Sequence, residues 1–393
     1  MKTKILFITS LVLITSVSLS QSKVNINNLV QYGDKMFKEN DDKPYTGLVF
    51  DLHRTTGNKS LEGRYKDGLK NGKWTQWYDN GNKKEEGTYK DGNQDREWTY
   101  WYENGNKKEN GTYKDGLMNG KWEYFYENSN NKGNGSFIEG DGENKSDIGI
   151  PRNGRQGKWI FYFENGQKKE EGTWKDGKGN GLFTGWYENG QKYFERTWKD
   201  NKSHGLFTGW SEDGQKEIEG TFNDGKRDGL WTRWSVWCVD KCSEITYKDG
   251  ELYGSFTEYY LNGQKKEEGT YNGLTESGDT IRVELFTVWY ENGQKEFEGT
   301  YNKDGKGDGL FTNWYENGQK EFEGTFKDDK REGLNTFWYE NGQKKQEENF
   351  IDDKNDGLLT VWYENGQKKF EFTYKDGEII STQMWNEDGS GKE

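Results

Sequence analysis

Residues 314–320 read Trp-Tyr-Glu-Asn-Gly-Gln-Lys, and close variants of this heptapeptide recur along the chain about every 24 residues. The glycines at its turn position are Gly57, Gly81, Gly105, Gly166, Gly190, Gly214, Gly263, Gly293, Gly318, Gly342, Gly366 and Gly389. Ser129 and Val239 stand at the same position in two degenerate copies, which gives about 14 units. A fixed period between about 20 and 50 residues is typical of a repeat architecture in which each unit stacks on its neighbours.

Each unit is expected to form a β-hairpin. Residues 309–315 and 320–326, on either side of Asn317-Gly318, are rich in β-branched and aromatic residues or alternate between polar and apolar. Asn-Gly favours a two-residue type I′ turn, and Lys-Asp-Gly segments such as residues 90–92 are expected to form the longer turns into the next unit. The predicted fold class is therefore all-β, an elongated repeat array of consecutive antiparallel β-hairpins.

A two-residue turn at Asn317-Gly318 predicts the cross-strand partners by counting. Phe311 should face Gly324, and Trp314 should face Glu321. The same count pairs Trp74 with Gly87, Trp98 with Gly111 and Trp159 with Gly172. A large ring beside a strand glycine covers the backbone that the glycine leaves bare, so this face should form the continuous core.

A second row of tryptophans lies four residues before the turns, on the opposite face. Its most regular members are Trp186, Trp210, Trp289, Trp314, Trp338 and Trp362. Aromatic residues flanked by Lys and Glu have the composition of a protein-contact surface, because Trp and Tyr dominate binding hot spots. Packing of one hairpin on the next would produce the same regularity. The row is therefore either a partner-binding surface or a structural contact.

The N-terminus has the pattern of a secretory signal peptide. Lys2 and Lys4 precede the apolar run Ile5–Leu13, and small residues follow up to Ser20. The run is short for a membrane span. We expect residues 1–20 to be a signal peptide, residues 21–44 an N-terminal segment, and residues 45–390 the repeat array, with insertions near residues 130–156 and 272–284. The protein should be exported to the periplasm, the cell surface or the medium.

The composition of the chain argues against nucleic-acid binding and against catalysis. The formal net charge is −13, which argues against nucleic acid because phosphate contacts need a basic face. Glutamate pairs such as Glu85 and Glu86 recur in most units, whereas a catalytic pair should occur once in a cleft. We expect no enzyme activity, no cofactor, no metal site and no transmembrane segment after signal cleavage. The Asp- and Gly-rich turn at residues 302–308 lacks the ligand pattern of a calcium loop.

Two cysteines, Cys238 and Cys242, stand four residues apart in one degenerate unit. An exported protein meets an oxidising environment, where such a pair can close a hairpin tip as a disulfide. A metal site needs more ligands than two thiols, and the two histidines lie in other units. A disulfide is the favoured interpretation.

The segment Gly111–Gly120, Gly-Thr-Tyr-Lys-Asp-Gly-Leu-Met-Asn-Gly, resembles the MORN repeat. The Trp-Tyr-Glu-Asn-Gly-Gln-Lys turn resembles its bacterial variant, whose members include YwqK-family antitoxins. The resemblance covers about residues 45–390. It implies arrays of consecutive hairpins that bind proteins, and it also implies an antitoxin or immunity role against a toxin.

These observations predict an exported, non-enzymatic repeat protein that acts as a protein-binding scaffold. Its partner is an unidentified protein, such as a toxin or a cell-envelope protein. An antitoxin of the YwqK family is one alternative. A carbohydrate-binding or surface-processing protein is another, because rows of Trp can stack on sugars.

Overall fold

The computed structural model describes residues 23–275 and 278–392. The expected signal peptide, residues 1–20, lies outside the described residues. The chain divides into two compact units, residues 1–157 and 158–393, and the division falls within strand β13 (Arg155–Tyr162). Each unit is described by itself below.

Unit 1 begins with short elements and continues as a ladder of strands. Its elements are β1 (Val24–Asn25), the 3₁₀ turn η1 (Ile26–Asn28), β2 (Leu29–Tyr32), β3 (Lys35–Lys38), β4 (Gly47–Leu52), β5 (Lys59–Lys66), β6 (Leu69–Lys70), β7 (Gly72–Trp77), β8 (Lys83–Lys90), β9 (Asn93–Trp101), β10 (Lys107–Lys114), β11 (Leu117–Phe125) and β12 (Asn131–Gly140).

Unit 2 contains strands alone among its described residues. These are β14 (Lys168–Lys175), β15 (Lys178–Gly179), β16 (Gly181–Trp186), β17 (Lys192–Lys199), β18 (Lys202–Trp210), β19 (Lys216–Asn223), β20 (Lys226–Arg227), β21 (Gly229–Arg233), β22 (Ser243–Lys248), β23 (Glu251–Tyr259), β24 (Lys265–Leu274), β25 (Thr280–Trp289), β26 (Lys295–Tyr301), β27 (Gly307–Trp314), β28 (Lys320–Lys327), β29 (Lys330–Trp338), β30 (Lys344–Ile351), β31 (Lys354–Asn355), β32 (Gly357–Trp362), β33 (Lys368–Lys375) and β34 (Glu378–Met384).

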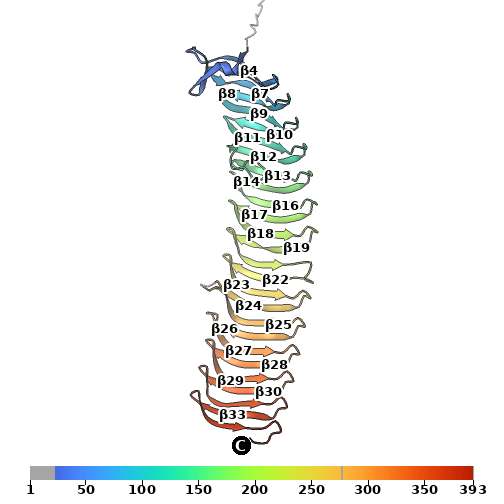
Figure 1. The fold of residues 1–393 in the computed structure, drawn as a ribbon, viewed down its shortest axis with the longest axis vertical. Coiled ribbons are helices and arrows are strands. Elements are labelled where there is room, and N and C mark those ends of the chain that lie inside the picture. The colour runs from blue at the N-terminus through green and yellow to red at the C-terminus, as the bar shows by residue number, and fades with distance from the viewer. Residues whose placement is uncertain (1–22, 276–277, 393) are drawn as a thin grey trace, which may run out of the picture. The chain divides into compact units, whose positions relative to one another are not determined.

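Within each unit the strands pair antiparallel with their neighbours in chain order, as Figure 1 shows. The one parallel pair described is β1 with β4, at the start of unit 1. The prediction of an all-β array of consecutive antiparallel hairpins is confirmed. Within the described ranges the chain forms no helix with the length and hydropathy of a membrane span.

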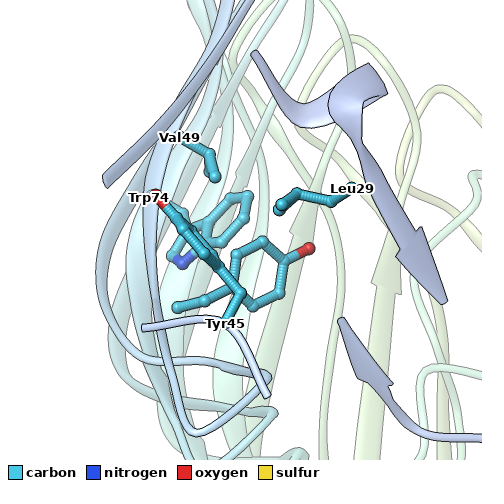
Figure 2. Packing of buried hydrophobic residues seen from close by; sticks show 5 residues of the cluster. Leu29, Tyr45, Val49 and Trp74 are labelled. Carbon is cyan, nitrogen blue, oxygen red and sulfur yellow. The ribbon is translucent and has the colours of Figure 1, made fainter. Parts of the chain in front are cut away.

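The first hairpins of unit 1 are capped by the segment that precedes the repeats. Leu29 of β2 extends towards the rings of Tyr45 and Trp74, with Val49 beside them, as Figure 2 shows. All four side chains are buried. Repeat arrays need such a cap because a terminal repeat has no neighbour on its outer side.

The two kinds of turn are the reverse of what the sequence predicts. The tight two-residue loop is Asp91-Gly92, where Lys90 pairs with Asn93 and both loop residues have positive φ, 49° and 89°. That is the geometry of a type I′ turn. The prediction of a type I′ turn at Asn317-Gly318 is wrong, because there only the glycine has positive φ, 81°.

The Asn-Gly turn is a three-residue loop. Tyr315 donates its N–H to the carbonyl of Gln319, so residues 316–318 form the loop, and Asn317 accepts from the Gln319 N–H through its side chain. A bulge at Glu321 then removes the extra residue from the register. Trp314 therefore pairs with Lys320 and not with Glu321, which corrects that prediction. Beyond the bulge Phe311 faces Gly324, as predicted.

The rings do not lie on the glycines that the sequence count assigned to them. Trp98 pairs in register with Gly111, but its ring lies on Gly87 of the preceding hairpin. A Cβ placed on Gly87 would stand 2.1 Å from the Trp98 ring. The Trp98 indole N–H also donates to the Thr88 carbonyl at 3.0 Å. The same arrangement joins Trp74 to Gly63, Trp122 to Gly111, Phe183 to Gly172 and Trp231 to Gly220. The contact therefore links successive hairpins.

The core is a single layer of rings packed edge to face. Trp98 is 1% exposed and lies between Tyr89 and Tyr113, whose ring centroids are 5.0 and 6.2 Å away at nearly perpendicular angles. Edge-to-face contacts suit the charge distribution of aromatic rings. A thin layer of rings thus supplies the core of a chain in which only 29% of residues are hydrophobic.

Asn335 occupies the ring position of its repeat and generates a stability prediction. It is fully buried on Gly324, and within the described structure neither polar atom of its side chain has a hydrogen-bond partner. The equivalent glycine, Gly299, accommodates both Phe311 and Phe297. Asn335→Phe should stabilise unit 2 by about 1–3 kcal/mol, because it removes an unsatisfied buried amide and restores a ring.

Urea unfolding of the full chain measures this change. The reverse substitution at an intact repeat, Phe311→Asn, is the control and should destabilise by about 3–5 kcal/mol. A neutral or destabilising Asn335→Phe would mean that the neighbouring rings already fill the space.

Candidate interaction surface

The strands of each hairpin present two faces. We call the face that carries Phe311, Gly324 and their equivalents in other repeats the aromatic face. The opposite face carries Thr312 and Trp314 with their partners Glu323 and Lys320, and we call it the tryptophan face. The six tryptophans singled out from the sequence all lie on this second face.

These six tryptophans are half-buried, and a lysine of the preceding hairpin lies over each ring. The distances from lysine nitrogen to ring centroid are 5.3 Å for Trp186, 5.4 Å for Trp210, 5.6 Å for Trp289, 5.6 Å for Trp314, 5.7 Å for Trp338 and 5.8 Å for Trp362. The same lysines bind a glutamate three residues further on, as Lys168 binds Glu171 at 2.9 Å. Each ammonium group is thus shared by a carboxylate and a ring.

The turn residues of the heptapeptide bind the next repeat as well. The Tyr315 hydroxyl donates to the Trp338 carbonyl at 2.9 Å, and Asn317 donates its side-chain N–H to the Glu340 carbonyl at 2.9 Å. Equivalent pairs join Tyr290 to Trp314 and Tyr339 to Trp362. Tyr, Asn and Lys therefore recur because each one contacts a neighbouring hairpin. This geometry favours the packing interpretation of the tryptophan row.

The charges of the tryptophan face are paired locally. Thr360 is 5% exposed and donates to Glu371 at 3.3 Å, and Lys368 binds the same carboxylate at 2.8 Å. In the repeat that begins at β14, the hydrogen bond from Lys168 lowers the pKa of Glu171. A face whose carboxylates are already bound offers few free charges to a ligand.

Cys238 and Cys242 are joined by a disulfide with Cα atoms 5.7 Å apart. The bond closes the loop between β21 and β22, which is the degenerate turn that contains Val239. This loop exposes apolar side chains that sequence reasoning passed over: Val236 is 66% exposed, and Trp237 and Val239 are both 77% exposed. The sequence indicates this apolar loop at residues 236–239, where Val-Trp-Cys-Val replaces the polar Tyr-Glu-Asn-Gly of other repeats.

The apolar loop continues onto the next turn. Val239 donates its N–H to the Leu261 carbonyl at 3.2 Å, and Leu261 is 61% exposed. Leu261 stands where most repeats have glutamate. Val236, Trp237, Val239 and Leu261 together form an exposed apolar cluster, which we call the disulfide-loop cluster.

The first expected insertion forms a pocket on the aromatic face of unit 1. Residues 141–154 join β12 to β13, with Ile150 fully buried. The buried Arg155 guanidinium donates to the Pro151 and Ile150 carbonyls at 2.7 and 3.1 Å. The cavity measures about 320 Å³, and its lining includes Glu109, Lys108, Lys145, Tyr113 and Trp122. Its size is at the lower end for sites that bind small molecules.

Glu109 is a half-buried carboxyl in this pocket. Burial raises its pKa above the ordinary value of 4.5, although Lys108, Lys145 and Lys132 act in the opposite direction. The second expected insertion, near residues 272–284, lengthens the hairpin of β24 and β25. Across the described ranges we find no cluster of three or more His, Cys, Asp or Glu side chains that could hold a metal ion.

Comparison with known proteins identifies the repeat. Nine segments match the family model described as MORN repeat variant: residues 70–91, 97–115, 155–176, 180–200, 252–272, 285–303, 307–328, 331–352 and 355–376. No curated protein matches the chain.

Solved structures give weak likenesses. The crystal structure of TcdB2-TccC3 is 11% identical, covering 89% of this chain and 19% of that chain with a TM-score of 0.17. The structure of the Photorhabdus luminescens Tc holotoxin pore is 12% identical, covering 89% of this chain and 21% of that chain with a TM-score of 0.15. The chain thus spans about a fifth of the length of these structures.

The Glu109 carboxyl gives a pH prediction. The pKa of Glu109 is higher in the folded protein than in the unfolded chain, so the unfolded chain loses this proton at a lower pH. The folded state therefore loses stability as the pH rises from the pKa of the unfolded chain towards that of the folded protein. Glu109→Gln removes this loss and should raise the melting temperature of unit 1 at about pH 7, with little gain at about pH 4.

Calorimetry at the two pH values checks this difference, and Glu97→Gln on an exposed strand position is the control. An equal gain at both pH values would show that the effect of the Glu109 substitution does not come from its ionisation.

Proposed function

Because this chain is a MORN-repeat protein, built of repeats that suggest a protein-binding scaffold, we propose that it is an exported, non-enzymatic scaffold for a protein partner. The observation that carries the proposal is the disulfide-loop cluster. Trp237 and Val239 are both 77% exposed, whereas most of the equivalent turns carry the polar sequence Glu-Asn-Gly. Exposed aromatic and aliphatic side chains on a constrained loop have the composition of a binding hot spot.

Two features support export. The N-terminal sequence has the charged start, the short apolar run and the small residues of a signal peptide. The disulfide between Cys238 and Cys242 suits an oxidising compartment. Intact-mass spectrometry of the native protein tests this part, since the cleaved chain should begin at Gln21.

The tryptophan row is a second candidate for the partner surface. Its rings are half-buried under lysines, so a partner would contact their edges together with the Lys and Glu side chains. Substitution of Trp314 and Trp338 by Thr keeps strand propensity. The row contributes to binding if the folded variant loses its partner.

Two alternative functions remain as proposals. An antitoxin or immunity protein would use the same cluster to cover a toxin, and the captured partner would then be toxic in the absence of this chain. A carbohydrate-binding protein would stack sugars on the tryptophan row, and a glycan array tests that alternative.

The partner proposal predicts a loss of binding from the loop. Beads that carry the exported protein should capture a partner from the envelope fraction, and Trp237→Ser with Val239→Ser should reduce recovery tenfold or more, about 1.4 kcal/mol. Both side chains are exposed, so the fold should tolerate the change.

Quantitative mass spectrometry of the captured proteins measures recovery. Tyr253→Ser, at a half-exposed strand position outside the loop, is the matched control and should retain the partner. Identical recovery by the wild type and the loop variant would exclude this cluster as the binding site.

A further inference from the structure

A row of exposed leucines runs along the tryptophan face of unit 2. Their exposed fractions lie between 51% and 57%. The row consists of Leu182, Leu206, Leu230, Leu285, Leu310, Leu334 and Leu358. Each leucine stands one residue before the ring position of its repeat. The strands that carry the row run from β16 to β32, in the green to red-orange part of Figure 1. We call this row the leucine ladder.

The leucine ladder alternates with small polar residues on the intervening strands. Leu310 pairs across β27 and β28 with Thr325, and Leu182 pairs across β16 and β17 with Thr197. One leucine therefore recurs every two strands, which is about 9.6 Å at a strand separation of about 4.8 Å. The repeat that contains β23 interrupts the row with Ser255.

Unit 1 is an internal control for what the hairpin itself needs. At the same position three of its repeats carry Lys73, Glu97 and Lys121, which pair with Thr88, Thr112 and Ser136 in the same register. The hairpin thus folds with a charged residue at this place. Leucine is not required there by the strand pairing, so its recurrence in unit 2 needs another explanation.

We propose that the leucine ladder is the contact surface for a second copy of this chain. A partner must match a period of about 9.6 Å over eight repeats. A helix rises about 10.5 Å per seven residues, so it would drift by about 1 Å at each repeat. A second copy has the same period and stays in register along the whole row. From the first repeat to the last, the row consists of three leucines, Ser255 and four leucines, and this order is nearly the same when it is reversed. An antiparallel two-fold pair can therefore bring the two rows together.

The area of the contact approaches that of a stable pair. A half-exposed leucine has roughly 80 Å² of apolar surface to lose, so two ladders of seven bury about 1,100 Å². That is near the lower limit of about 1,200 Å² for specific interfaces, before the threonines between the leucines are counted.

Electrostatic attraction does not drive the proposed dimer. The carboxylates next to the ladder are already bound within each copy, as Glu323 is bound by Lys320. The net charge of −13 opposes association of two identical chains, and salt screens that repulsion. The pair should therefore tighten as the salt concentration rises.

Sedimentation velocity of the full exported chain at micromolar concentrations tests the proposal. The wild type should sediment as a dimer, and Leu310→Lys with Leu334→Lys should raise the dissociation constant at least tenfold, because each dimer loses four apolar contacts and gains four like charges. Lysine stands at this position in β7 and β11, so the variant should fold, and its melting curve checks that.

Two further variants complete the experiment. Ile380→Lys replaces a side chain that is 63% exposed on β34 outside the ladder, and it should leave the dimer unchanged. If the lysine variant unfolds, the double variant Leu310→Thr with Leu334→Thr is measured instead. A wild type that is monomeric at all concentrations overturns the proposal, and so does a folded variant that still dimerises. Either failure leaves the partner proposed for the disulfide-loop cluster unaffected, since that partner is measured by capture.

Discussion

The structure depends on one contact, a large ring that lies flat on the bare backbone of a glycine in the preceding hairpin. Trp98 approaches Gly87 so closely that no Cβ fits between them, and its indole N–H binds the adjacent carbonyl. Because the contact joins one hairpin to the next, no hairpin of this kind can bury its ring alone. Stacking of repeats is thus a requirement of folding, and the edge-to-face packing of neighbouring rings follows from it.

The residues of the heptapeptide also link one hairpin to the next. The Tyr hydroxyl, the Asn amide and the Lys ammonium each contact the following repeat, so the residues that recur are those that have partners in another hairpin. The departures from the repeat are therefore the places where the chain can carry a particular function. They include the first insertion, which lies over the half-buried Glu109, the apolar loop closed by the disulfide, and the leucine ladder of unit 2.

Counting from the turn glycines predicted most of the strand register, although the reasoning about the turn was wrong. A three-residue loop at residues 316–318 adds one position, and the bulge at Glu321 removes it again. The register beyond the bulge is therefore the same as for a two-residue turn. Trp314 lies between the loop and the bulge, where the register still differs by one residue. Its predicted partner was therefore wrong. Asp-Gly and Asn-Gly are both compatible with a type I′ turn, and local propensity did not distinguish between them.

The sequence by itself determined the repeat, the hairpins, the two faces and the identity of the core rings, because period and alternation are local properties of the chain. Only the tertiary structure decided which glycine each ring covers and which side chains remain exposed. Trp314 and Leu310 are both apolar and lie on one face, yet the first is half-buried under Lys295 while the second is 52% exposed. Exposure depends on what the neighbouring hairpin places over a residue, and that contact joins positions about 20 residues apart in the chain. No pattern within a single repeat contains that information.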